Sequence, residues 1–222
     1  AKGATPPRDA LLIGAPYAAP NGTETGAAYL IERVTAGEHR LDDAANRTYV
    51  GAAEGDGAGW ALATADLTED GVPELVIGAP FNDSNGTDSG AAYVLPIEES
   101  DSKRADRGPT VRETRAVAID TGLTLEGVAS GDGAGFSLAA VGHALEPNGE
   151  ESRGDGDGEP LPYRGSDLAI GAPFSDATGT DAGAVYVVDS EAIRGRLSLG
   201  AANATLTGER AGDRTGWSVA GG

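Results

Sequence analysis

A motif that recurs three times constrains the fold more than any other feature of this chain. Gly-Ala-Pro followed by an aromatic residue begins at Gly14, Gly78 and Gly171, and a tyrosine lies fifteen residues after each of these glycines. A second block, Gly-x-x-x-Gly-Asp-x-x-Gly, also occurs three times and is followed each time by an aromatic residue: Trp60, Phe136 and Trp217. Recurrence at fixed intervals is typical of repeat architectures, in which each repeat is one supersecondary unit.

The repeat contains four short runs with strand character. In the second repeat they lie at 60–65, 74–79, 90–95 and 123–127, separated by turn residues. The first period is 64 residues and the second is 93, because extra residues stand at about 96–118 and 142–166, where we expect loop insertions. Four strands per repeat predict an all-β fold, a β-propeller-like array of four-stranded antiparallel blades within one domain, 1–222.

The two ends of the chain cut one blade in half. The chain opens on a second strand, 9–16, and ends on a first strand, 216–221. In a self-closed ring, residues 216–220 would pair with residues 10–15. Because three blades are fewer than the usual four to eight, we favour part of a larger propeller, and a self-closed or oligomeric ring is the alternative.

Small and aromatic residues have predicted roles in stacking these blades. We expect the Gly-Ala-Pro strand to lie near the central axis, where bulky side chains would hold the blades apart. The aromatic residues at 60, 136 and 217 could stack on a ligand, but their equivalent positions favour packing between blades. The same prediction applies to Tyr29, Tyr93 and Tyr186.

These motifs resemble the FG-GAP repeat of the integrin alpha-subunit β-propeller family. Blades of that family run from aromatic-Gly through a calcium loop to Gly-Ala-Pro and then Gly-x-x-Tyr, and the match covers nearly the whole chain outside the two insertions. The resemblance implies an extracellular module for adhesion or recognition of a protein or glycan. It also implies calcium as the bound ion.

The residues between the first two strands of the second repeat offer a set of oxygen ligands. Asp66, Thr68, Asp70 and Glu74 stand at loop positions 1, 3, 5 and 9, and Val72 can add its carbonyl. Calcium takes six to eight hard oxygen ligands, so we predict a calcium site here. The alternative is a plain Asp-Gly turn stabilised by aspartate side chains.

A second group of acids lies in and after the longer insertion. Asp155, Asp157 and Glu159 form a cluster in that insertion, and Asp167 occupies the position of Glu74 in the third repeat. These residues are a weaker calcium candidate, and the alternative is a solvated acidic loop.

Charge and composition narrow the classes of function. The 222 residues carry 35 acidic and 16 basic side chains, a net charge of -19, which disfavours a nucleic-acid partner. The absence of cysteine excludes disulfides and cysteine-ligated metals. The sequence contains no run of eighteen apolar residues, so we predict no transmembrane segment. It starts without an apolar signal core, which indicates a mature or excised chain. The composition resembles that of haloarchaeal proteins, whose carboxylates hold water in molar salt.

Three function classes follow from these features. The first is a calcium-binding surface module of a halophile, for adhesion or recognition. The second is the propeller domain of a secreted hydrolase acting on carbohydrate or phosphoester, for which acid pairs such as 42–43 and 98–99 could do acid–base chemistry. The third is a structural cell-surface subunit. No nucleophile and base stand at a recognisable spacing, so we predict that the chain is not an enzyme.

Two kinds of short motif have ordinary alternatives. The Arg-Gly-Asp sequence at 153–155 is expected by chance in a chain so rich in these residues. Asn-x-Ser/Thr sequences, which accept glycans in exported proteins but are also good turn formers, begin at Asn21, Asn46, Asn82, Asn85 and Asn203.

Overall fold

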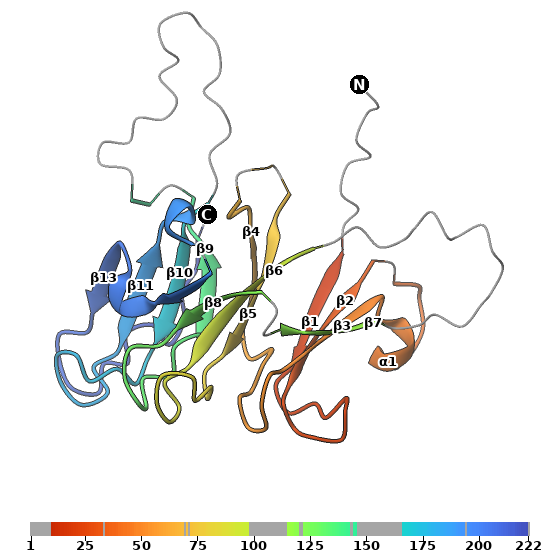
Figure 1. The fold of residues 1–222 in the computed structure, drawn as a ribbon, viewed down its shortest axis with the longest axis horizontal. Coiled ribbons are helices and arrows are strands. Elements are labelled where there is room, and N and C mark those ends of the chain that lie inside the picture. Colours follow the sequence, from red (N-terminus) through yellow and green to blue (C-terminus); the bar gives the residue numbers. More distant parts are fainter. Residues whose placement is uncertain are drawn as a thin grey trace, which may run out of the picture.

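The computed structural model describes residues 10–32, 34–68, 70, 72–97, 115–119, 122–142, 144–145, 166–193 and 195–221. Three small sheets, which we name blades A, B and C in chain order, stand side by side (Figure 1). Blade A contains β1 (Leu11–Ala15), β2 (Ala27–Ile31) and β3 (Arg47–Val50). Blade B contains β4 (Leu62–Ala65), β5 (Glu74–Ala79), β6 (Ala91–Pro96) and β8 (Leu123–Glu126). Blade C contains β9 (Ser137–Ala140), β10 (Leu168–Ala172), β11 (Ala184–Val188) and β13 (Ala204–Thr207).

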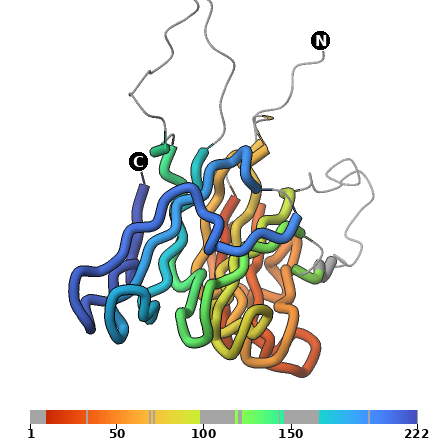
Figure 2. The backbone as a smooth tube through the Cα atoms, turned by 60° about the vertical axis from the view of Figure 1, so that its left-hand side comes forward, coloured from red at the N-terminus to blue at the C-terminus, as the bar shows by residue number. Residues whose placement is uncertain are grey.

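The four-strand unit predicted from the sequence is confirmed in blades B and C. Neighbouring strands of each unit pair antiparallel, with Gly78 opposite Ala92 in blade B and Gly171 opposite Val185 in blade C. The connections after Gly-Ala-Pro all lie at the same end of the blades (Figures 1 and 2). In the part of the chain that the structure describes, helical structure is confined to short segments: α1 (Leu41–Ala44), the 3-10 turns Ser190–Ala192 and Leu199–Ala201, and a 3-10 residue at Ile119.

The central strand β5 explains why the middle of a blade reads as a continuous apolar run. Leu75, Val76 and Ile77 are all fully buried. Leu75 and Ile77 pack with residues of blade A, whereas Val76 packs with residues of blade C. Successive side chains of a strand point to opposite faces, so a strand between two sheets needs apolar residues at every position.

The glycine of Gly-Ala-Pro is required by the neighbouring blade. A Cβ atom at Gly78 would lie 2.0 Å from the carbonyl oxygen of Gly135, which precedes β9, the first strand of blade C, by two residues. The same approach occurs at Gly14, where the Gly59 carbonyl lies 2.0 Å away, and at Gly171. The stacking role predicted for these small residues is therefore confirmed, and its cause is a backbone-to-backbone contact.

Each seam between blades is also crossed by a strand that the sequence did not indicate. Strand β7 (Arg115–Ala118) lies in the connection from β6 to β8 but pairs parallel with β3 of blade A. Strand β12 (Arg196–Ser198) lies in the connection from β11 to β13 and pairs parallel with β8 of blade B. The insertion expected at 96–118 thus ends in a strand that ties two blades together. Of the insertion at 142–166, the structure describes only four residues.

The two ends of the described chain do not meet. Strand β1 has β2 as its one neighbour in blade A, and residues 216–221 form no strand. Gly216 instead lies against Gly171 of blade C, at the opposite end of the array from β1 (Figure 1). The pairing of 216–220 with 10–15 that a self-closed ring would need is therefore absent among the described residues. No helix in those residues has the length and hydrophobicity to cross a membrane.

Candidate functional site

The predicted calcium loop, 66–74, connects β4 to β5 in blade B. Asp66 and Glu74 are buried at its two ends, with 5% and 7% of their surface exposed. The carboxylate of Glu74 accepts the Leu67 N–H at 2.8 Å and the Thr68 hydroxyl at 3.0 Å. These contacts fold the loop back on itself, which places the third and ninth loop positions together.

The remaining predicted ligands lie on the outer part of this loop. Asp70 is exposed, and its carboxylate accepts the N–H of Val72 at 2.8 Å. Among the described residues, no three acidic or histidine side chains gather around one point. The donor set is nevertheless made of the hard oxygens that calcium prefers, with two buried carboxylates in one short loop. Calcium there would take over oxygens that now accept hydrogen bonds from the loop itself.

The loop is also joined to the neighbouring blade. The N–H of Ser166, which precedes β10 of blade C, donates to the Asp66 carbonyl at 2.8 Å. Next to it, Asp167 is buried, and its carboxylate accepts the N–H of Leu145 at 3.0 Å. Asp167 thus has the same role as Glu74, accepting a backbone N–H of its own loop. Asp155, Asp157 and Glu159, and the Arg-Gly-Asp sequence, lie outside the described residues.

The repeated aromatic residues form a continuous row across the three blades. The ring of Phe136 lies 5.2 Å from that of Trp60 and 4.7 Å from that of Trp217. Phe81 packs edge-on against Trp60, and Phe174 does so against Phe136. The prediction of packing between blades is confirmed, although the row is only half-buried. The predicted burial of the three tyrosines, Tyr29, Tyr93 and Tyr186, is also confirmed.

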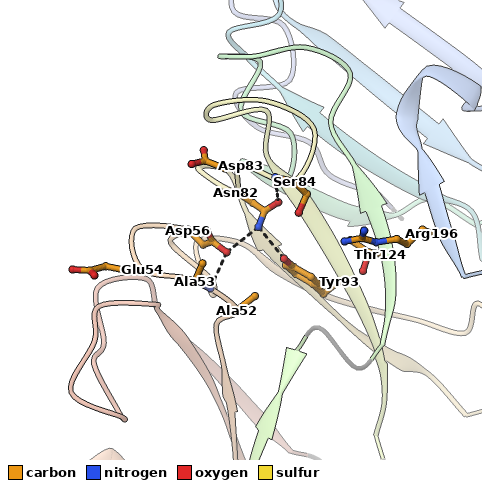
Figure 3. Close-up of a pocket in the computed structure, with 10 residues that line it drawn as sticks. All are labelled: Ala52, Ala53, Glu54, Asp56, Asn82, Asp83, Ser84, Tyr93, Thr124 and Arg196. Atoms are coloured by element: carbon orange, nitrogen blue, oxygen red, sulfur yellow. Dashed lines mark hydrogen bonds between the residues drawn. The ribbon is translucent and has the colours of Figure 1, made fainter.

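A polar network that the sequence did not reveal joins blade A to blade B. The amide nitrogen of Asn82 donates to the Asp56 carboxylate at 2.8 Å and to the Tyr93 hydroxyl at 3.0 Å (Figure 3). Asp56 is 3% exposed, and burial raises the pKa of its carboxyl, against the lowering effect of the hydrogen bonds from Asn82 and Ala53. The Gly-Asp pair of the repeated block could have indicated this network in the sequence, because the pair recurs at the same place in every repeat.

The next seam repeats this arrangement with a smaller partner. Ser175 stands where Asn82 stands in blade B, and it hydrogen-bonds Tyr186. Burial raises the pKa of Asp132, the equivalent of Asp56, and also that of Tyr186. Polar residues that recur in the repeats are therefore buried at both seams.

A shallow pocket of about 310 Å³ opens beside the Asp56 network. Exposed carboxylates of Glu54 and Asp83 lie on one side, and Arg196 of β12 lies on the other (Figure 3). Arg196 is paired with Glu126 at 3.2 Å but keeps 70% of its side chain exposed. The pocket therefore offers both donors and acceptors to a polar ligand. Of the acid pairs considered for catalysis, Asp42 is exposed and paired with Arg40 at 3.1 Å, and 98–99 lie outside the described residues.

Comparison with known proteins agrees with the repeat pattern. Residues 58–95 and 166–188 match the FG-GAP repeat. The chain is 31% identical to human (Homo sapiens) phosphatidylinositol-glycan-specific phospholipase D over 220 residues, which are 95% of this chain and 22% of that protein. It is also 31% identical to the Bos taurus protein of the same name, over 90% of this chain and 21% of that protein. The chain thus spans about a fifth of the length of these relatives. What the family comparison identifies in it is FG-GAP repeat sequence, in a chain whose described structure is an array of small β-sheets.

Proposed function

We propose that this chain is a calcium-binding β-propeller module that recognises a protein or glycan outside the cell, as part of a larger propeller. The observation that supports recognition is the polar pocket at the seam of blades A and B. The repeated polar residues are used within the seams, whereas Glu54, Asp83 and Arg196 at the pocket rim remain exposed. A rim with separate donors and acceptors suits a ligand rich in hydroxyl or peptide groups.

Calcium binding at 66–74 is the part of the proposal that can be tested directly. Extracellular calcium modules bind with dissociation constants of about 10⁻⁴–10⁻³ M. Because an ion that binds only the folded chain stabilises it, calcium at about 10 mM should raise the melting temperature and a chelator should lower it. Asp66→Asn should abolish this shift, and Asp176→Asn, in the loop after Gly-Ala-Pro of blade C, should preserve it. A shift that survives Asp66→Asn would place the ion elsewhere.

Ligand recognition needs its own test. The chain should bind members of a glycan array through the seam pocket, and Arg196→Ala should weaken that binding by about tenfold, a typical loss when a charged hydrogen-bond donor is removed from a binding site. The control is Arg210→Ala, because Arg210 is exposed in the segment after β13 of blade C and does not line the pocket. Unchanged binding by the Arg196 variant would contradict recognition at this pocket.

The second candidate is the propeller region of a hydrolase. It is favoured by the 31% identity to phosphatidylinositol-glycan-specific phospholipase D over nearly the whole chain. In that case the chain should bind immobilised phosphatidylinositol-glycan without hydrolysing it, since the chain corresponds to only part of that enzyme. Binding to the glycan array but not to this lipid would exclude the second candidate.

The acidic composition supports a high-salt setting. A net charge of -19 repels itself, and salt screens that repulsion. We expect the strand signal in circular dichroism to be lost during dialysis from molar to millimolar KCl at fixed calcium. A signal that stays constant would contradict the halophilic assignment.

A further inference from the structure

The five Asn-x-Ser/Thr sequences differ in what the fold does with each asparagine side chain. An N-linked glycan is attached to the side-chain nitrogen, Nδ2, so this atom must be reachable and must leave any hydrogen bond that it makes. In the described structure, the sequences beginning at 21, 82 and 85 lie in the connections after Gly-Ala-Pro, and those at 46 and 203 immediately precede outer strands. These environments can be ranked by the contacts of Nδ2.

Asn82 is the least accessible of the five. Its side chain is 4% exposed, and Nδ2 donates to both Asp56 and Tyr93. Its Oδ1 accepts the N–H of Ser84 at 2.9 Å. The whole amide is therefore used inside the seam (Figure 3), and a sugar on Nδ2 would separate blade A from blade B.

Asn21 and Asn85 form a matched pair. Both begin the sequence Asn-Gly-Thr, and each stands seven residues after the glycine of its Gly-Ala-Pro motif. Nδ2 of Asn85 donates to the carbonyl of Gly127 at 2.8 Å and to that of Val128 at 3.3 Å. At the same position in blade C, the Thr178 hydroxyl donates to the equivalent carbonyl of Gly208 at 2.6 Å.

Blade A lacks this tie between the loop and the outer strand. Asn21 is exposed, and its side chain makes no hydrogen bond within the part of the chain that the structure describes. Pro20 precedes Asn21, whereas Ser84 precedes Asn85, so the residue before the same tripeptide differs between the two loops. The fold thus uses Asn85 as a structural donor and leaves Asn21 without a structural role.

The two remaining asparagines are held by their oxygen atoms. Oδ1 of Asn46 accepts the N–H of Glu32 at 2.9 Å, and Oδ1 of Asn203 accepts the N–H of Asp189 at 3.0 Å. Thr48, the hydroxyl residue of the first of these sequences, is buried. These two side chains therefore have a structural role that Asn21 does not have.

We propose that Asn21 is an acceptor for an N-linked glycan and that Asn82 is excluded from this modification by the fold. This inference depends on the extracellular location in the proposed function, but not on calcium or on the seam pocket. The donor would be an oligosaccharide linked to a lipid phosphate. Nδ2 forms a bond to the anomeric carbon, the bond from that carbon to the phosphate oxygen breaks, and one amide proton leaves with the lipid phosphate.

The test uses the folded full chain, a purified single-subunit oligosaccharyltransferase and a lipid-linked oligosaccharide. Occupancy of each site is measured by glycopeptide mass spectrometry, and peptides 17–26 and 81–90 give the intrinsic reactivity of each sequence. The carbonyls of Gly127 and Val128 hold the Asn85 amide in place. The ratio of Asn21 to Asn85 modification should therefore be at least about fivefold higher in the chain than in the peptides, the factor expected for giving up one hydrogen bond. Asn82 should stay unmodified, and Thr23→Val should abolish modification at Asn21.

Two results would overturn the proposal. One is a ratio of Asn21 to Asn85 modification that is the same in the chain as in the peptides. The other is modification of Asn82 in the folded chain to the same extent as Asn21. Melting of the chain is measured separately with calcium and with a chelator, so a chain that accepts glycan at Asn21 but has no calcium-dependent melting would contradict the calcium site alone.

Discussion

The turns at Asp56, Asp132 and Asp213 have the same local structure in different surroundings. In each, the aspartate carboxylate accepts the backbone N–H of the residue three positions earlier, at 3.2, 3.1 and 2.9 Å. The first two aspartates are buried under the following blade, whereas Asp213 is exposed. The turn therefore forms from its own sequence, and the burial comes from the neighbouring blade.

The outer strands of the blades show the same contrast in apolar residues. Tyr49, Leu125 and Leu206 occupy equivalent positions in blades A, B and C, as the strand registers show. Tyr49 and Leu125 are 1% and 0% exposed, but Leu206 is 59% exposed on the uncovered face of blade C. The same strand position thus belongs to the core in two blades and to the surface in the third.

The largest expected effect on stability distinguishes a leucine that is covered by another blade from one that is not. Leu125→Ala should lower the free energy of unfolding by about 3 kcal/mol, because it leaves a cavity in the core. Leu206→Ala should change it by less than about 0.5 kcal/mol. Urea denaturation of the two variants measures both values. Equal losses would show that blade C is covered in solution and would remove the contrast between the blades.

A slightly smaller loss of folding stability is expected when a substitution forces two blades apart at their seam. Gly78→Ala should destabilise the chain by about 2–3 kcal/mol, since the new Cβ meets the Gly135 carbonyl and the backbone must shift. Gly200→Ala is the control, because its Cβ would make ordinary contacts of 3.5 Å or more. Both are measured by urea denaturation. A seam that tolerates Gly78→Ala without loss would contradict the close approach of the blades.

The pH dependence of stability should distinguish the buried from the exposed turns. Burial raises the pKa of Asp56 above its ordinary value, so the folded chain binds this proton more tightly than the unfolded chain does. The stability contributed by the protonated form is fully present below the unfolded-state pKa near 3.8, and it is lost as pH rises through the folded-state pKa.

Asp56→Asn removes this titration. The stability of the variant relative to the native chain should therefore increase from pH 3 to pH 7, as followed by urea denaturation at each pH. Asp213→Asn removes an exposed carboxylate and serves as the control. If the native chain and the Asp56→Asn variant have parallel stability curves across this range, the carboxyl of Asp56 is not desolvated by blade B.

The smallest expected effect is on the fluorescence emission of the two tryptophans of the chain. Trp60 packs against three rings within the array, whereas Trp217 is 49% exposed at its end. In Trp60→Phe, the remaining emission should be red-shifted and readily quenched by acrylamide. In Trp217→Phe, it should be blue-shifted and better protected. Protection of Trp217 that grows with protein concentration would show that another copy covers this end.

The repeat intervals were sufficient to predict the strands but not the links between blades. Strands β4, β5, β6 and β8 lie close to the predicted runs because short apolar segments bounded by turn residues act locally. Strands β7 and β12 were missed because each is short and is stabilised by pairing with another blade. The Asp56–Asn82 contact was missed for a similar reason, since its partners are 26 residues apart in the chain.

The candidate sites also have features that the local sequence predicted and features that depend on contacts between distant segments. Spacing alone placed the oxygen-bearing residues of 66–74 in one loop, and the structure brings Thr68 and Glu74 into contact. The tripeptides at Asn21 and Asn85 are identical, so they did not distinguish the two sites, and the contacts of Asn85 with the carbonyls of Gly127 and Val128 come from residues more than 40 positions away.

What the sequence determined by itself is the local unit: the four strands, the Gly-Asp turns and the positions at which glycine recurs. These follow from periodicity and from backbone conformations that few residues adopt, both of which are set within a few residues. What only the tertiary structure decided is which copies of each repeated position are buried. The burial of Leu125 and Asp56, and the exposure of Leu206 and Asp213, depend on whether another blade stacks on them, and desolvation arises from contacts between segments far apart in the chain.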